Sequence, residues 1–330
     1  MIILNISSIF WNIQKFFNFF KIYFFIRRQI FSTRRTNIKS FILNTSNESL
    51  PKSDYKLTLD SNFRRILRLE NITINPKTGV MWKKNMLVRE SSVWDTYSLL
   101  KWEPLPLFPK DIDENVLSLP DNGFFHFLIE DLPRFLDAYD FGLGLKVIAG
   151  SQQGYVLDVI RMLSLNSVIY PKYPLRVKSI VFSEKSPEML YSAKDHATLK
   201  KFGENFSKPC KKLKIFIKRE DLKSTKANSR GLNYQANVEN KLKSLGFKIV
   251  VLEKFHFDNQ IEQISQADTL VSFHGAGLAN MIWMKPNSKV IELVSERFTR
   301  HFEFISEIGG YEYQQVNVKK FINEAEKYLH

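Results

Sequence analysis

Apolar residues recur with two different spacings after about residue 120, and these spacings predict alternating helices and strands. Residues 124–139 repeat their apolar positions with the period of a helix, in which Pro133 is expected to cause a kink or a junction of two helices. The elements predicted after it are strands at 146–149, 167–170 and 179–182 and a helix at 154–165. Such alternation is typical of an α/β protein with a parallel sheet.

A second alternating series follows the basic stretch at residues 201–214, which we take as a domain boundary. The elements predicted for this series are strands at 212–218, 248–252, 269–273 and 289–294 and helices at 234–245, 257–267, 278–284, 303–308 and 318–329. Neither series contains a glycine-rich P-loop. We therefore expect two Rossmann-like domains, at residues 41–205 and 206–330, with ligands at the carboxyl ends of their strands.

The pattern before residue 100 is shorter and more extended. Apolar residues at 72–74 and 80–82 flank Pro76 and Gly79, and this arrangement predicts a β-hairpin. Residues 41–60 are polar and are expected to form a linker.

The first 40 residues combine many aromatic side chains with seven basic residues and no acidic residue, which is half of the net charge of +14. The longest uncharged run is fourteen residues, short of the roughly 20 apolar residues that a membrane-spanning helix needs. Several aromatic positions fall at helical spacing, so we interpret residues 1–40 as an amphipathic helix on an anionic membrane surface. The alternative is a helix that packs on its own domain or on a partner. The rest of the chain is only mildly basic, which disfavours a nucleic-acid-binding protein.

The composition limits the remaining possibilities. The chain has 44% hydrophobic and 25% charged residues, as an ordinary globular protein has. Cys210 is the single cysteine, so an intrachain disulfide and a cysteine-rich zinc site are both excluded. The absence of paired cysteines favours a cytoplasmic, membrane-associated bacterial enzyme, and the alternative is a membrane-anchored protein of the Golgi or ER lumen.

The strand predicted at 269–273 leads directly into a turn of small residues that opens a short helix. The residues of this turn and helix start are His274, Gly275, Ala276, Gly277, Leu278 and Asn280. Glycines let backbone N–H groups approach a ligand, and a helix start favours an anion such as a diphosphate. The alternative is that both glycines only let the strand and the helix pack closely. A dinucleotide fingerprint would need a third glycine where Asn280 stands, which disfavours a nicotinamide-dependent oxidoreductase.

Two further groups of residues are candidates for binding or catalysis. Glu292 is a carboxylate within the apolar strand at 289–294, where it could bind ribose hydroxyls or form a salt bridge. His126 and Glu130 are four residues apart and share one face of the predicted helix. This pair could act in acid–base catalysis, bind a metal together with another ligand, or form a capping or buried hydrogen-bonded pair.

Together these segments resemble the glycosyltransferase family 61 domain. The first matching motif, at residues 123–134, has two aromatic residues, a histidine, an acid four residues later, and Leu-Pro-Arg. The second contains Arg219 and the stretch from Arg230 to Asn233, and the third runs from Gly246 through the turn at His274 to Glu292. The order and spacing of the motifs agree with that family over residues 65–310.

The resemblance implies a GT-B fold, in which two Rossmann-like domains face a cleft. It also implies transfer of a sugar, with inversion, from a nucleotide-sugar donor to a glycan acceptor. Relatives include xylose and N-acetylglucosamine transferases of eukaryotes and bacterial proteins of capsule and other surface polysaccharides. No cofactor and no metal are expected besides the donor. The alternative is a catalytically silent protein of the same fold that binds a glycan or a nucleotide.

The resemblance also suggests a role for each motif. Glu130 is the expected base, Asp131 is its reserve, and His126 orients or replaces it. Arg219 and Arg230 are expected to pair with the leaving diphosphate. The other expected donor-binding residues are Asn233, His274, Gly275, Ala276, Gly277, Leu278, Asn280 and Glu292, with Glu292 holding the ribose.

Overall fold

The computed structural model describes residues 66–84, 86–88, 91, 106, 108–184, 191–220, 232–295 and 300–329. By their contacts, the described residues divide into two compact units. The first unit contains the residues up to Asn122, Glu130–Gln152 and Leu165–Glu188, and the second contains Gly123–Ile129, Gln153–Ser164 and Met189 onward. The predicted membrane-contacting segment at 1–40 and the linker at 41–60 lie outside the described residues, so both stay predictions.

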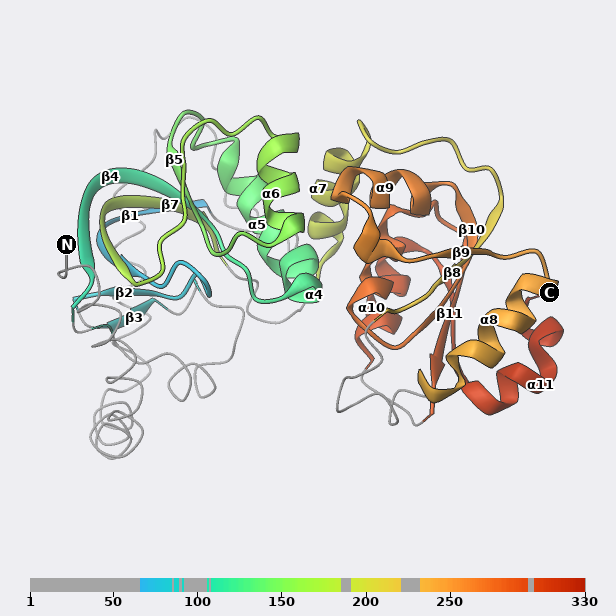
Figure 1. Ribbon diagram of the computed structural model, residues 1–330. Coiled ribbons are helices and arrows are strands. Elements are labelled where there is room, and N and C mark those ends of the chain that lie inside the picture. Colours follow the sequence, from blue (N-terminus) through green and yellow to red (C-terminus); the bar gives the residue numbers. More distant parts are fainter. Residues whose placement is uncertain are drawn as a thin grey trace, which may run out of the picture. The chain divides into compact units, whose positions relative to one another are not determined.

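The described part of the first unit forms a seven-stranded sheet in the order β3-β2-β1-β7-β4-β5-β6 (Figure 1). Its strands are β1 (Ile66–Ile74), β2 (Met81–Lys83), β3 (Met86–Val88), β4 (Lys110–Leu119), β5 (Lys146–Ala149), β6 (Val168–Ile169) and β7 (Leu175–Ser183). Strands β7, β4, β5 and β6 are parallel, whereas β1 is antiparallel to both β7 and β2. The predicted hairpin is confirmed, because Thr73 pairs with Trp82 and Ile74 with Met81.

Strand β4 was not expected from the sequence, because its first half is charged. Only its last four residues, Val116–Leu119, pair with β5, whereas pairing with β7 begins at Lys110. The first half therefore has a neighbour on one side only, and water solvates its polar side chains. Asp111 forms an ion pair with Arg176 across the sheet at 3.1 Å. Apolar alternation is weak in such a strand, so the hydrophobic pattern does not show it.

The helix predicted at 124–139 is three consecutive helical segments. These are α4 (Phe124–His126), a π-helical segment η3 (Phe127–Asp131) and α5 (Leu132–Tyr139). Pro133 lies in the first turn of α5, so the predicted junction is confirmed. A single α-helix through His126 and Glu130 is wrong, because a π segment has i→i+5 hydrogen bonds and changes which residues share a face.

The described part of the second unit has a five-stranded sheet in the order β12-β11-β10-β8-β9, with all neighbours parallel. Its strands are β8 (Leu213–Ile217), β9 (Lys248–Val250), β10 (Ala267–Phe273), β11 (Lys289–Val294) and β12 (Glu312–Asn317). Its helical segments are α6 (Gly154–Met162), α7 (Ala193–Gly203), η4 (Leu232–Tyr234), α8 (Gln235–Ser244), η5 (Leu252–Lys254), α9 (Phe257–Ser265), η6 (Ala276–Trp283), α10 (His301–Gly309) and α11 (Val318–Leu329), together with α4. The parallel α/β prediction is confirmed for this unit.

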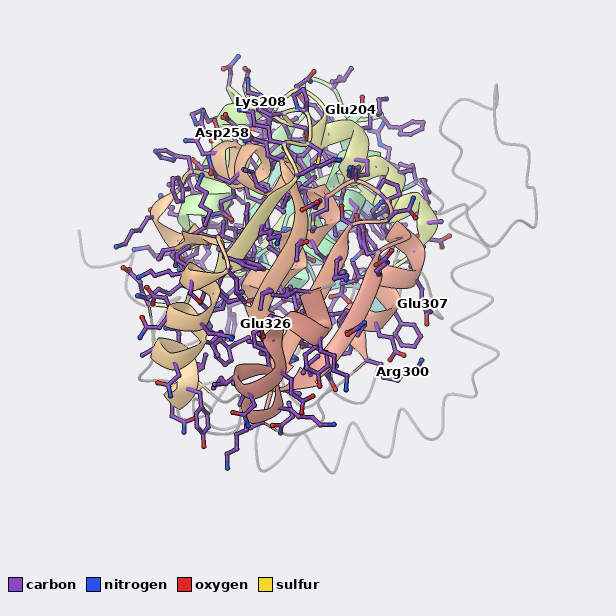
Figure 2. The ribbon with its side chains drawn as sticks, turned by 90° about the vertical axis from the view of Figure 1, so that its right-hand side faces the viewer. Glu204, Lys208, Asp258, Arg300, Glu307 and Glu326 are labelled. Carbon is purple, nitrogen blue, oxygen red and sulfur yellow. The ribbon has the colours of Figure 1, made fainter. Side chains whose placement is uncertain are left out.

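Helices lie on both faces of this second sheet, as they do in Rossmann-like folds. Figure 1 shows α8 and α11 on one side of the sheet and α10 on the other. Buried residues of β8, β10 and β11, including Phe216, Phe273 and Leu293, form one core cluster with residues of α8 and α11. In Figure 2, Asp258 of α9 and Glu326 of α11 lie toward opposite ends of this unit.

Two elements of the second unit carry no strong apolar pattern and were missed. Helix α7 is mostly polar and begins with a capping box formed by Ser192 and Asp195. Strand β12 has the sequence EYQQVN and pairs with β11 at one side of the sheet. The contacts place residues 189–205 in the second unit, whereas the sequence suggests a single boundary near residue 205. The expectation that residues 41–205 form the acceptor-side domain and residues 206–330 the nucleotide-sugar-binding domain stays a prediction.

Candidate functional site

Two neighbouring strands of the second sheet end beside each other and bring Arg219 to the turn at His274. Strands β8 and β10 are parallel, and Ile217, the last residue of β8, pairs with Ser272. The residues that follow these strands therefore lie at the same edge of the sheet. The Arg219 Nη1 donates a hydrogen bond to the His274 carbonyl oxygen at 3.4 Å. The carboxyl ends of parallel strands are where ligands bind in such sheets.

Close approach of Arg219 explains one of the two glycines in the turn. Gly275 has an extended backbone with φ 163° and ψ 169°, which any residue can adopt. A Cβ atom at this position would overlap the Arg219 guanidinium. A Cβ at Gly277 would make only an ordinary contact with Ile217, at 3.6 Å. A Cβ atom at 275 would therefore require the Arg219 side chain to move, whereas a Cβ atom at 277 fits without a shift.

The side chain of Gln235, which belongs to no recognised motif, holds the backbone of Arg219. Gln235, the first residue of α8, is 4% exposed. Its Oε1 accepts from the Arg219 N–H at 3.0 Å, and its Nε2 donates to the Arg219 carbonyl oxygen at 2.9 Å. This two-point contact fixes the backbone of Arg219 just after the end of β8, and so the point from which its side chain extends. No motif marks Gln235, because its role depends on the packing of α8.

Glu292 lies in β11 with its side chain completely buried. Adjacent residues of a strand point to opposite faces, so Glu292 points away from the core cluster that contains Ile291 and Leu293. Its register partner in β12 is Gln315, and Tyr313 lies two residues earlier on the same face. Gln315 Nε2 donates to Glu292 Oε2 at 2.9 Å, and the Tyr313 hydroxyl donates to the same oxygen.

The other carboxylate oxygen of Glu292 is bonded to His274. Its Oε1 pairs with the Nδ1 of His274, whose side chain is 15% exposed. When this Nδ1 carries the proton, the other ring nitrogen, Nε2, is the acceptor of the imidazole. Burial, followed by the charge of Glu292, raises the pKa of Tyr313 well above its usual value, so its hydroxyl stays protonated and donates. Glu292 is therefore placed to position His274, and its expected contact with the ribose stays a prediction.

In the first unit, Glu130 and Asp131 end the π segment and are buried, with 4% and 2% exposure. Asp131 Oδ2 accepts hydrogen bonds from the side chain and the backbone N–H of Asn122, at 2.9 and 3.3 Å. Burial raises the pKa of Asp131 to about 7, against the lowering effect of the Asn122 bonds and of Arg134. A carboxyl group that titrates near neutral pH is suited to proton transfer.

Arg134, of the Leu-Pro-Arg motif, is buried and has a structural role. Its Nε and Nη2 donate to the carbonyl oxygen of Ser183, the last residue of β7, at 3.1 and 3.0 Å. Its Nη2 also donates to the Ser91 carbonyl oxygen at 3.3 Å. The arginine thus ties α5 to the end of β7, and its charge acts on the neighbouring Asp131.

The family model for Glycosyltransferase 61 matches residues 124–291, about half of the chain. The chain belongs to the glycosyltransferase 61 family. The matched residues run from the start of α4 into β11, and they include the acidic motif, Arg219 and the turn at His274. The recognition made from the sequence motifs is confirmed.

Two plant proteins are similar to part of this glycosyltransferase 61 chain. A beta-1,2-xylosyltransferase RCN11 of Oryza sativa subsp. japonica is 31% identical over 118 residues, which cover 32% of this chain and 22% of that protein. A beta-1,2-xylosyltransferase of Arabidopsis thaliana is 28% identical over 122 residues, which cover 32% of this chain and 23% of that protein. The match spans less than a quarter of either relative. Both relatives are plant proteins, so they give no support to a bacterial cytoplasmic localisation.

The remaining site residues expected from the glycosyltransferase 61 motifs have different surroundings. Asn280 has no exposed surface, and its side chain bonds the Gly277 carbonyl oxygen at 3.1 Å and the Trp283 indole N–H at 3.1 Å. These bonds shape the turn, and a donor contact by Asn280 stays a prediction. Asn233 is exposed in η4, and Arg230 lies outside the described residues. His126 ends α4 in the second unit.

Neither a cluster of metal ligands nor a membrane-spanning helix is found among the described residues. They contain no group of three or more His, Cys, Asp or Glu side chains that could hold a metal ion. Asp111 and Asp113 in β4 form an Asp-x-Asp sequence, a pattern that can bind a divalent metal. Here the two carboxylates pair with Arg176 and Lys178, at 3.1 and 3.6 Å. Metal independence stays a prediction. Among the helices of the described residues, none is long and apolar enough to cross a membrane.

Proposed function

We propose that this chain is an inverting glycosyltransferase with a GT-B arrangement, which transfers a sugar from a nucleotide-sugar donor to a glycan acceptor. The observation that carries the proposal is the placement of Arg219 against the turn at His274, at the carboxyl ends of two parallel strands. Family membership and the names of the two relatives support a sugar transferase. The plant origin of both relatives favours the Golgi or ER lumen as its location.

The donor diphosphate would bind to Arg219 and to the turn. A guanidinium can pair with two oxygens of a phosphate at once. The backbone N–H groups at the start of η6 face the same edge of the sheet as Arg219, and a helix start favours negative charge. His274, oriented by Glu292, lies beside them. Positive charge and dipoles at this place would stabilise the diphosphate as it leaves.

Calorimetry with a panel of nucleoside diphosphates tests the donor site. Arg219→Ala is expected to weaken binding by roughly 1.5–3 kcal/mol, which is typical of a hydrogen bond to a charged group. Gly275→Ala should weaken binding as well, because its Cβ would displace the arginine. Gly277→Val should block the approach of a diphosphate to the backbone while leaving the fold intact.

A matched control is Arg161→Ala, which removes an arginine of the same unit from an exposed ion pair with Asp258. This control should keep wild-type affinity. Wild-type affinity in folded Arg219→Ala and Gly277→Val proteins would exclude the proposed donor site.

Inversion requires a base that takes the proton of the acceptor hydroxyl. Glu130 is our first candidate, and Asp131 is the second because its pKa is raised to about 7. Glu130→Gln should lower turnover by about 10²-fold or more, with little change in donor affinity. If Asp131→Asn is the inactive variant instead, Asp131 is the base. If both variants retain activity, His126 is the next candidate.

A second candidate function is a catalytically silent protein that binds a glycan or a nucleotide. The burial of both candidate carboxylates, at 4% and 2% exposure, favours it. An activity assay with a panel of nucleotide-sugars separates the two functions, because a silent protein binds a nucleoside diphosphate but neither transfers nor hydrolyses the sugar of any of these donors.

A further inference from the structure

A pocket lies beside Asp131 in the first unit, where the parallel strands β4 and β7 end. Its cavity volume is about 20 Å³, and Ser118 of β4 and Ser183 of β7 line it together with Asp131 and Arg134. Phe135 and Met81, each 2% exposed, form part of its apolar wall. The pocket is therefore an interior feature of this unit, separate from the turn at His274.

Three side-chain oxygens that line this pocket have no hydrogen-bond partner within the described structure. They are Asp131 Oδ1, Ser118 Oγ and Ser183 Oγ. A buried polar atom without a partner costs about 1–3 kcal/mol, and native proteins contain only a few such atoms. Three of them around one pocket indicate a common partner rather than three separate defects.

We propose that this pocket is a binding site for ordered water, which hydrogen bonds to Asp131 Oδ1 and to the hydroxyls of Ser118 and Ser183. A buried water typically makes about three hydrogen bonds to polar groups that otherwise lack them. A cavity of about 10–15 Å³ is enough to hold one water molecule, so the space is sufficient for a single water. A cavity of this volume is too small for a sugar, and the Asp131, Ser183 and Phe135 side chains around it are each no more than 2% exposed.

Water fits this site because it serves both protonation states of Asp131. It donates to an ionised carboxylate and accepts from a protonated carboxyl group, while the two serine hydroxyls rotate to complete its hydrogen bonds. The charged groups that act on Asp131 are Arg134 and Glu130. Arg134 is already bonded to the Ser183 carbonyl oxygen, so it closes one side of the site. The proposal does not depend on sugar transfer.

Ser118→Ala and Ser183→Ala in the full chain test the site, because a wet pocket and a dry pocket predict opposite signs. If each hydroxyl bonds to water, its removal should lower the melting temperature by about 2–4 °C. If the hydroxyls have no partner, their removal relieves a penalty and the melting temperature rises. Ser288→Ala is the matched control, since Ser288 Oγ is also buried without a partner in the described structure but lies outside the pocket lining. The melting temperature of the Ser288→Ala variant should not fall below that of the wild type.

A crystal structure of the full chain provides the second measurement. We expect a water oxygen within about 3 Å of Asp131 Oδ1 and of at least one serine hydroxyl. A pocket without such a water, together with a rise in melting temperature for both serine variants, would overturn the proposal.

Discussion

Two buried carboxylates, Glu292 in the second unit and Asp131 in the first, have opposite hydrogen-bonding surroundings. Both oxygens of Glu292 are bonded, one to His274 and the other to Tyr313 and Gln315. Asp131 has one bonded oxygen, which accepts twice from Asn122, whereas its Oδ1 has no partner within the described structure.

The difference follows from the elements that hold the two side chains. Glu292 lies inside a regular parallel sheet, where register places partners beside it on the same face. Asp131 lies at the junction of a π segment and an α-helix, where the regular hydrogen-bond pattern is interrupted. A carboxylate whose hydrogen bonds are complete can position a neighbour, and one with an unused oxygen can bind a ligand or exchange a proton.

The largest expected effect is that of Glu292→Ala. It removes the shared partner of three partly buried side chains, and breaking a buried charged pair typically costs 3–5 kcal/mol. Urea unfolding of the full chain measures the loss. Glu326→Ala is the control, because Glu326 is half-exposed and paired with Lys241, and should cost about 0–1 kcal/mol. Equal losses in the two variants would mean that the Glu292 contacts do not stabilise the unit.

A smaller effect, confined to a pH range, is expected for Asp131→Asn. The pKa of Asp131 is raised from 3.8 to about 7 in the folded chain, so the folded state binds a proton that the unfolded state releases. Its contribution to stability is complete below pH ~4 and is lost as the pH rises to about 7, by ~1.4 kcal/mol per pH unit at most. Asp131→Asn should remove this slope.

Thermal unfolding between pH 4 and pH 8 measures that slope, with Asp113→Asn as the control on an exposed ion pair. The other charges near the carboxyl group, on Glu130 and Arg134, remain in both proteins. If Asp131→Asn keeps the wild-type slope, Asp131 is ionised throughout this range and the comparison between the two carboxylates fails.

Much of the fold could be predicted because its strands and helices carry strong apolar periods. The hairpin at Thr73 and Trp82 and the parallel order of β8, β10 and β11 follow from local patterns of this kind. Strand β4 and helix α7 could not be predicted in this way. Neither element has an apolar stripe. Strand β4 is supported by ion pairs across the sheet, and helix α7 by its capping box.

The candidate site was also predictable in part, because some of its residues belong to local sequence motifs. The small residues after β10 and the arginine after β8 are local motifs, and they lie at the same edge because parallel neighbours end together. Tyr313 and Gln315 could have been suspected only from the alternation in EYQQVN, because nothing else in the sequence assigns them to Glu292. Gln235 has no sequence signal at all.

The sequence by itself determined the family, the α/β class and the motifs at Arg219 and His274, since each depends on residue types at short spacing. Tertiary structure alone decided what the carboxylates do. Register between β11 and β12 completes the hydrogen bonds of Glu292, and packing around the end of the π segment buries Asp131 beside a polar pocket. The physical reason is that hydrogen bonding and desolvation depend on neighbours that are distant in the chain, and spacing along the chain does not specify those neighbours.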